Sequence, residues 1–260
     1  MTAEPPVDLP GPVSELVDVL AALPGAEAVV LGGSRVSGSD EPSSDWDLGL
    51  YYRGAIDLTA LAAFGTVFPP GSWGRIMNGG AWLQRGGEKV DVLLRDLDVV
   101  DHWTARAREG VFERDALLGY VAGIPTYSLC AELASCRPLR GRVEPVPFPT
   151  ALAAAAPGVW RFSRTFSLDY ARAHAKRGQT AGVVGQASMA VMCEAHAIVC
   201  ARGEWICNEK HLVRAAGLDA VNARFARVPV DPRDLDGWVN GVAAELGSGA
   251  GDAAPWARNP

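Results

Sequence analysis

The chain has 260 residues, of which 48% are hydrophobic and 21% charged, and its net charge at pH 7 is −6. This composition belongs to a globular protein that buries a core in one large domain or two smaller ones. It argues against nucleic-acid binding, which needs basic patches, and no apolar run reaches the roughly 20 residues of a membrane span.

The N-terminal segment, residues 1–11, has neither a basic start nor an apolar stretch, so we expect a short disordered leader rather than a secretory signal. A cytoplasmic location follows as the default. The five cysteines are an odd number and include no closely spaced pair of the kind that binds zinc, so we expect buried, free thiols.

The first half of the chain predicts helices and strands in mixed order, and the second half predicts helices alone. Periodicity and turn signals give, in chain order, a helix at 12–23, strands at 28–31 and 47–52, a helix at 56–64, a hairpin of 80–84 and 89–94, and helices at 97–108 and 128–136. A cluster of prolines from Pro138 to Pro149 marks a boundary, and the later helices are expected at 151–177, 181–201, 210–216 and 234–246.

This pattern predicts an α+β protein with two domains. A mixed sheet with flanking helices occupies residues 12–145, and a C-terminal helical bundle occupies residues 146–246. Residues 247–260 are rich in Gly, Ala and Pro and are expected to form a flexible tail.

A glycine-rich turn follows the first predicted strand. Gly32 and Gly33 have no Cβ, so the backbone can approach a phosphate closely and offer its N–H groups. Ser34 adds a hydroxyl at the start of a helix, whose N-terminus favours an anion. Arg35 supplies either a cation for the phosphates or an outward salt bridge. The tripeptide alone is most often an ordinary turn.

Three aspartates follow on two predicted strands. Asp45 and Asp47 flank one residue, so their side chains share a face about 6.6 Å apart and can converge on two metal ions about 3.5–4 Å apart. Asp91 lies in an otherwise apolar strand, where a carboxylate is costly unless it is paired, hydrogen-bonded or bound to a metal. Carboxylate oxygens suit Mg²⁺, which also takes oxygens from nucleotide phosphates. The order of these features favours a nucleotide-handling enzyme.

The combination of Gly33-Ser34, Asp45-Trp46-Asp47 and Asp91 resembles the DNA polymerase β-like nucleotidyltransferase superfamily, over about residues 26–95. The helical half is similar, more loosely, to the companion domain of small bacterial members that modify aminoglycosides and lincosamides. The chain departs from the family pattern in its second glycine before Ser34 and in the acidic loop 41–44. Members that act on RNA carry additional binding domains, and nothing in this chain resembles one.

The resemblance implies specific roles for these residues. Asp45 and Asp47 would hold two Mg²⁺ ions against the phosphates of ATP or another nucleoside triphosphate, and Gly33 and Ser34 would bind the β/γ end. Asp91 would complete the metal site or act as the base. The hydroxyl of the acceptor would attack the α-phosphorus in line, and pyrophosphate would leave.

In such enzymes the acceptor lies between the two domains, so the helical half is expected to contribute substrate contacts. Glu194 and His196 interrupt an apolar helix and are either satisfied core residues or face a cleft, and Glu194 is the better candidate to hold an amine or assist deprotonation. Lys210 either reaches the nucleotide's phosphates or is solvated beside a capping Asn208. Three tryptophans are candidates for stacking on a base or sugar, or for the core: Trp73, Trp82 and Trp205.

The sequence therefore predicts a Mg²⁺-dependent nucleotidyltransferase, a monomer or homodimer, that moves AMP from ATP to a hydroxyl of a small molecule such as an antibiotic. Two alternatives stay open. One is nucleotidylation of a protein side chain, as in antitoxin-like relatives. The other is a non-catalytic, nucleotide-binding regulatory protein, although such a protein has no need of a third carboxylate.

Overall fold

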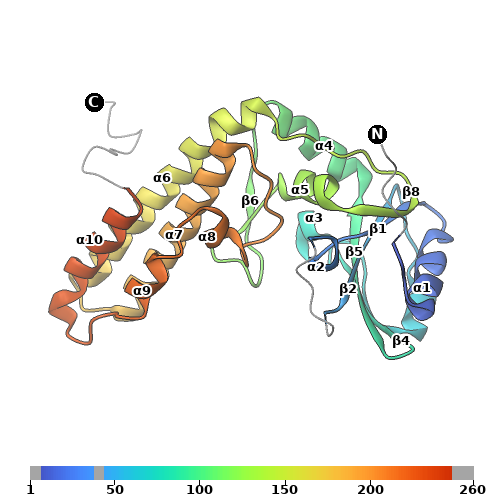
Figure 1. Cartoon of the computed structure of the whole chain (residues 1–260), viewed down its shortest axis with the longest axis horizontal. Helices are drawn as coiled ribbons and strands as arrows, with labels where there is room; N and C mark the ends of the chain where they lie inside the picture. Colours follow the sequence, from blue (N-terminus) through green and yellow to red (C-terminus); the bar gives the residue numbers. More distant parts are fainter. Residues whose placement is uncertain (1–6, 38–43, 248–260) are drawn as a thin grey trace. The chain divides into compact units, whose positions relative to one another are not determined.

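The computed structural model describes residues 7–37 and 44–247, which form two compact units (Figure 1). The first unit comprises the residues up to 105 together with 129–147, and the second comprises 106–128 and the residues from 148 onward. This division differs from the predicted one in the segment 106–128, which belongs to the helical unit. The start of the predicted leader, most of the acidic loop and nearly all of the predicted tail lie outside the described residues.

The first unit is built on a mixed six-stranded sheet, which confirms the predicted α+β class. The order of the strands is β3-β4-β5-β2-β1-β8. They are β1 (Ala26–Leu31), β2 (Trp46–Tyr52), β3 (Gly65–Phe68), β4 (Gly80–Arg85), β5 (Glu88–Asp96) and β8 (Arg137–Gly141). Strands β2 and β5 pair in parallel and the other neighbours pair antiparallel. Gly86 and Gly87, both at positive φ, make the predicted tight turn between β4 and β5.

Most of the predicted helices of this unit are present. They are α1 (Gly11–Ala21), α4 (Leu97–Arg108), which reaches into the second unit, and α5 (Ser128–Ser135). The predicted helix at 56–64 is instead a short 3₁₀ helix, η1 (Thr59–Ala63), which begins where Asp57 accepts a hydrogen bond from the Thr59 N–H at 2.9 Å. One-turn helices lie at α2 (Ser34–Ser37), which begins as predicted after the glycine turn, and at α3 (Gly74–Met77).

The two faces of the sheet have different surroundings. One face carries alternate residues such as Val90 and Val92 into the core of the unit, where they meet α1 and η1. Helix α1 buries four side chains there, each worth about 1.5–3 kcal/mol: Val13, Leu16, Val17 and Leu20. On the opposite face, buried Arg95 forms a two-pronged ion pair with Glu132 of α5, with N···O distances of 2.5 and 2.7 Å. This pair ties α5 to one end of that face, beside the site described below.

The second unit is a helical bundle. Its long helices are α6 (Thr150–Ala175), α7 (Thr180–Arg202) and α10 (Leu235–Glu245), and its shorter elements are α8 (Leu212–Ala215), α9 (Val221–Phe225), η2 (Pro232–Asp234) and the hairpin of β6 (Arg114–Asp115) and β7 (Ile124–Pro125). Within residues 7–37 and 44–247, α7 is the one helix long and apolar enough to cross a membrane, and 61% of its most apolar window is buried. That degree of burial is the pattern of the core helix of a bundle.

Candidate active site

The candidate site lies on the face of the sheet opposite α1, where three neighbouring strands carry exposed or half-buried side chains in register. Asp47 of β2 is paired with Asp91 of β5, and Asp91 is paired in turn with Trp82 of β4. Paired residues point to the same face, and neighbouring strands lie about 4.8 Å apart. The structure therefore brings Asp47 and Asp91 side by side, and Trp82 extends the row.

The neighbouring carboxylates affect the pKa of Asp91. The pKa of Asp91 is raised, first by burial and then by the charges of Asp47 and Asp45, and Lys89 opposes this shift only as the smallest contribution. The ionised form of Asp91 is therefore less favourable in the folded chain than in a free aspartate. A cation bound between the carboxylates would remove this penalty.

The glycine turn is in direct contact with Asp47. Gly33 has a φ of +67°, and a Cβ at this position would lie 1.8 Å from Oδ2 of Asp47. The N–H of Gly32 continues the sheet and donates to the carbonyl of Asp47 at 2.8 Å. The predicted phosphate turn and the first carboxylate are thus one local structure. The N–H of Gly32 is therefore used by the sheet and is not available for the phosphate contact that the sequence predicts for it.

Arg35 and Asp45 have places that the sequence did not predict. The guanidinium of Arg35 donates to the backbone carbonyls of Ser44 and, at 3.3 Å, of Asp45, and it lies 4.0 Å from the centroid of the Trp46 ring. These contacts fix the residues that precede β2. Asp45 is exposed and comes before the strand, so it lies outside the alternation that aligns Asp47 with Asp91.

The expected convergence of three carboxylates is therefore not present in this structure. In the part of the chain that the structure describes, no three His, Cys, Asp or Glu side chains gather closely enough to hold a metal ion. Asp47 and Asp91 form the pair, and Asp45 contributes through its charge at longer range.

Glu194 in α7 is a core residue with its own cationic partners. It is 4% exposed and accepts hydrogen bonds from Arg164 at 2.6 Å and from Arg161 at 3.3 Å, both on α6. This arrangement corresponds to the satisfied core residue, one of the two interpretations left open by the sequence. An acid–base role for Glu194 has no support in this geometry, because the carboxylate is neutralised within the bundle.

Lys210 belongs to the same unit and is exposed. Its backbone N–H donates to Oδ1 of Asn208 at 2.9 Å, but the helix expected at 210–216 begins only at Leu212 with His211 before it, so Asn208 closes a turn and does not cap that helix. The structure gives Lys210 no contact that marks it as a phosphate ligand.

His196 is buried beside an aromatic cluster in the helical unit. Its ring stacks on Trp160 with centroids 4.2 Å apart and an interplanar angle of 8°, and its Nδ1 lies 3.2 Å from the hydroxyl of Tyr127. Burial, with a smaller contribution from Arg114, lowers the pKa of His196 from 6.5 to about 3. The imidazole is therefore neutral at physiological pH.

This shift predicts a pH-dependent stability. Between pH 6.5 and about 3 the unfolded chain binds a proton at His196 that the folded chain does not, so stability falls as the pH falls through this window. Each pKa unit of separation contributes about 1.4 kcal/mol. We expect His196→Phe, which keeps the stacking, to flatten the difference in urea stability between pH 7 and pH 4, measured by circular dichroism. Exposed His211→Phe is the control, and parallel profiles for wild type and His196→Phe would contradict the assignment.

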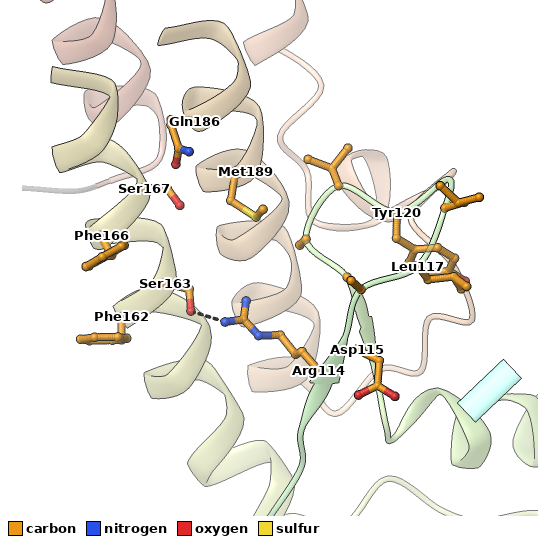
Figure 2. Close-up of a pocket in the computed structure, with 15 residues that line it drawn as sticks. Arg114, Asp115, Leu117, Tyr120, Phe162, Ser163, Phe166, Ser167, Gln186 and Met189 are labelled. Atoms are coloured by element: carbon orange, nitrogen blue, oxygen red, sulfur yellow. Dashed lines mark hydrogen bonds between the residues drawn. The ribbon is translucent and has the colours of Figure 1, made fainter. Parts of the chain in front are cut away.

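The helical unit also contains an open pocket of about 840 Å³ (Figure 2). Its lining comes from α6, α7 and the β6–β7 loop, and includes Phe162, Phe166, Met189 and Tyr120. Arg114 donates to the hydroxyl of Ser163 at 2.9 Å at this site. The volume lies in the range of about 300–1,000 Å³ that small-molecule sites occupy.

Buried Glu209 shapes one wall of this pocket. Its carboxylate accepts the backbone N–H groups of Val121 at 2.5 Å and Ala122 at 2.8 Å, and both residues belong to the lining loop. The sequence did not predict the pocket, because it depends on how the β6–β7 loop packs against two helices. Exposure of Trp82 was also missed, although the alternation of Trp82 with the buried residues Ala81 and Leu83 is a signal for it.

Comparisons with known proteins add little to this geometry. No protein-family model and no curated protein sequence matches the chain. Among solved structures, a nucleotidyltransferase-like protein from Exiguobacterium sibiricum is similar, with 13% sequence identity over 90% of this chain and 72% of that chain, and a TM-score of 0.45. A likeness of this degree says nothing about the reaction, so the carboxylate row is the basis for assigning a function.

Proposed function

We propose that the chain is a nucleotidyltransferase, which transfers a nucleoside monophosphate from a nucleoside triphosphate to a hydroxyl group and releases pyrophosphate. The observation that carries this proposal is the pairing of Asp47 with Asp91 directly beside the Gly33 turn. Adjacent carboxylates repel each other, which contributes to the raised pKa of Asp91, and a cation bound beside them relieves that repulsion. A cation held beside a glycine turn that admits a phosphate is the arrangement that phosphoryl transfer needs.

The carboxylate pair fits Mg²⁺. This ion binds one or two protein carboxylates and takes its remaining ligands from substrate phosphates and water. Asp47 and Asp91 would hold it, and Asp45 would add negative charge from the edge of the site. When bound, the ion neutralises charge on the phosphate oxygens.

The residues of the chain have distinct tasks in the reaction. The backbone at Gly33 and the hydroxyl of Ser34 hold the phosphates of the donor, because the absence of a Cβ at Gly33 keeps this turn open. Asp91 accepts the proton of the acceptor hydroxyl, for which it must be ionised, and a divalent ion beside it favours the ionised form. The freed oxygen forms a bond to the α-phosphorus as the bond from that phosphorus to pyrophosphate breaks.

A small molecule is the acceptor that the chain favours. A net charge of −6 disfavours a polyanionic acceptor such as RNA and suits a neutral or cationic one. AMP from ATP is the default donor group, and antibiotics with free hydroxyls are one class of acceptor to test.

Pyrophosphate release tests the proposal directly. The protein is incubated with Mg²⁺ and each nucleoside triphosphate in turn, with aminoglycosides, lincosamides or a cell extract as acceptors, and with EDTA as the control. We expect release that depends on the protein and on Mg²⁺, and a mass increase of one nucleoside monophosphate on a small molecule. A mass increase on protein would favour the alternative of protein nucleotidylation. No turnover with any acceptor, together with unchanged nucleotide binding in Asp47→Asn, would overturn the proposal.

A further inference from the structure

An aromatic cluster continues the row of carboxylates. The cluster consists of Phe68 on β3, Trp82 on β4, and Trp73, which lies between these strands in the chain. The ring centroid of Phe68 is 4.6 Å from that of Trp82 and 4.9 Å from that of Trp73, and the two tryptophan centroids are 6.1 Å apart. Trp82 is 56% exposed, which is unusual for so large an apolar side chain on a sheet. The cluster is therefore not a core, and its largest open surface belongs to the residue paired with Asp91.

The backbone around the cluster is shaped to hold it. Phe68 is paired with Gly80, two residues before Trp82 on the same face. A Cβ at Gly80 would lie 1.9 Å from the carbonyl oxygen of Val92 and 2.6 Å from the ring of Trp73, so glycine at this position admits both the paired strand and the indole. Trp73 and Phe68 in turn contact Trp82 and limit its freedom. A flat surface with few accessible rotamers costs little entropy when a ligand binds to it.

The position of Trp82 along the row separates it from the glycine turn. Gly33 contacts Asp47, Asp47 is paired with Asp91, and Asp91 is paired with Trp82. Because the attacking and leaving oxygens are in line in phosphoryl transfer, an acceptor approaches from the side opposite the pyrophosphate. If the phosphates lie at Gly33, that side is the one on which Trp82 lies.

We propose that Trp82, supported by Trp73 and Phe68, is the platform on which the acceptor binds, and that the acceptor is an uncharged or cationic alcohol with a ring. A ring that lies flat on the indole would place a hydroxyl beside Asp91. The carboxylates of Asp91 and Asp47 repel a phosphorylated or carboxylated ring, whereas a cation is attracted both by them and by the face of the indole. This inference rests on the proposed function, because it takes Gly33 as the donor side.

Binding measurements without turnover test the platform. Saturation-transfer NMR is recorded on the full chain with Mg²⁺ and a non-hydrolysable ATP analogue. The probes are methyl glucoside and glucosamine as sugar rings, benzyl alcohol as an aromatic ring, glycerol as an alcohol without a ring, and glucose 6-phosphate as an anionic ring. We expect at least one uncharged or cationic ring to bind, and glycerol and glucose 6-phosphate to bind more weakly. Which of the two ring types binds distinguishes a sugar from an aromatic acceptor.

Variants at Trp82 provide the decisive comparison. Trp82→Ala should weaken ring binding by about 5- to 100-fold, the range that loss of one stacking contact produces, and Trp82→Phe should restore most of it. Tyr170→Ala, which removes an aromatic side chain of 50% exposure from the helical unit, is the matched control and should change nothing. Equal ring binding by wild type and Trp82→Ala, or no ring binding by wild type, overturns the platform.

The signals of the ATP analogue in the same spectra separate this inference from the proposed function. Loss of analogue binding in Trp82→Ala would show that Trp82 holds the donor's base, which also overturns the acceptor assignment. If wild type binds no analogue and Asp47→Asn changes nothing, the proposed function itself fails. If the analogue binds normally and Trp82→Ala leaves the binding of the ring probes unchanged, the acceptor platform is overturned and the proposed function is not.

Discussion

Replacing Asp91 with asparagine is expected to slow pyrophosphate release by about 10²- to 10⁴-fold, the range that loss of a general base produces. Asparagine keeps the size of the side chain and its place on β5, but it neither accepts the proton nor carries the charge that faces Asp47. Stopped-time assays of pyrophosphate at saturating ATP and Mg²⁺ measure the effect. A variant with the rate of the wild type would show that Asp91 is not the base.

The same substitution should stabilise the protein when no metal is present. The raised pKa of Asp91 means that the folded chain binds its proton more tightly than the unfolded chain does, so its contribution to stability falls as the pH rises through that window. At pH 7 the ionised carboxylate is a net cost that asparagine removes. We expect the melting temperature of Asp91→Asn in EDTA to exceed that of the wild type by on the order of 2 °C. Exposed Asp8→Asn, a control without this crowding, should show no such gain.

Replacing Gly33 with alanine should reduce activity by about 10²-fold, because the new methyl group displaces the carboxylate on which the site depends. The added Cβ would lie 1.8 Å from Oδ2 of Asp47, so the carboxylate or the turn must move. Displacements of about 1 Å in such a site cost rates of this order. The φ of +67° adds backbone strain of about 1–2 kcal/mol in an L-residue.

The variant Gly54→Ala is a control that has the backbone strain of an alanine at positive φ without a clash like that between residue 33 and Asp47. Gly54 has a φ of +71°, and a Cβ there meets nothing within 4 Å. This control should lose a similar amount of stability to urea while keeping its activity. Equal losses of activity in both variants would mean that strain alone, and not contact with Asp47, explains the effect of Gly33→Ala.

Local patterns predicted the parts of the molecule that depend on neighbouring residues. Alternation of apolar side chains predicted the ends of β2 and β5 to within one or two residues. Gly86 and Gly87 predicted the turn of the β4–β5 hairpin. The sequence placed Asp47 and Asp91 each on a strand, and the two side chains lie side by side because β2 and β5 are paired in the sheet. Strand β3 was missed because it has four residues, and β8 because it lies at the edge of the sheet.

The remaining features depend on tertiary packing. Glu194 is satisfied by two arginines 30 and 33 residues earlier in the chain, and no spacing rule predicts such a pair. Arg35 turns back onto the carbonyls before β2, a geometry set by the conformation of the loop. Asp45 lies outside the strand because β2 begins at Trp46, one residue before the predicted start at 47 but one residue after Asp45.

The placement of β8 affects how the sheet unit folds during synthesis and how it can be expressed as a separate fragment. β8 pairs with β1 at the edge of the sheet, yet it is translated only after residues 106–128, which belong to the other unit. On the ribosome, the backbone edge of β1 stays uncovered until residue 141 has emerged, and an uncovered edge is a template for aggregation. No single cut in the gene yields the sheet unit intact. A stable fragment of it requires joining residue 105 to residue 129.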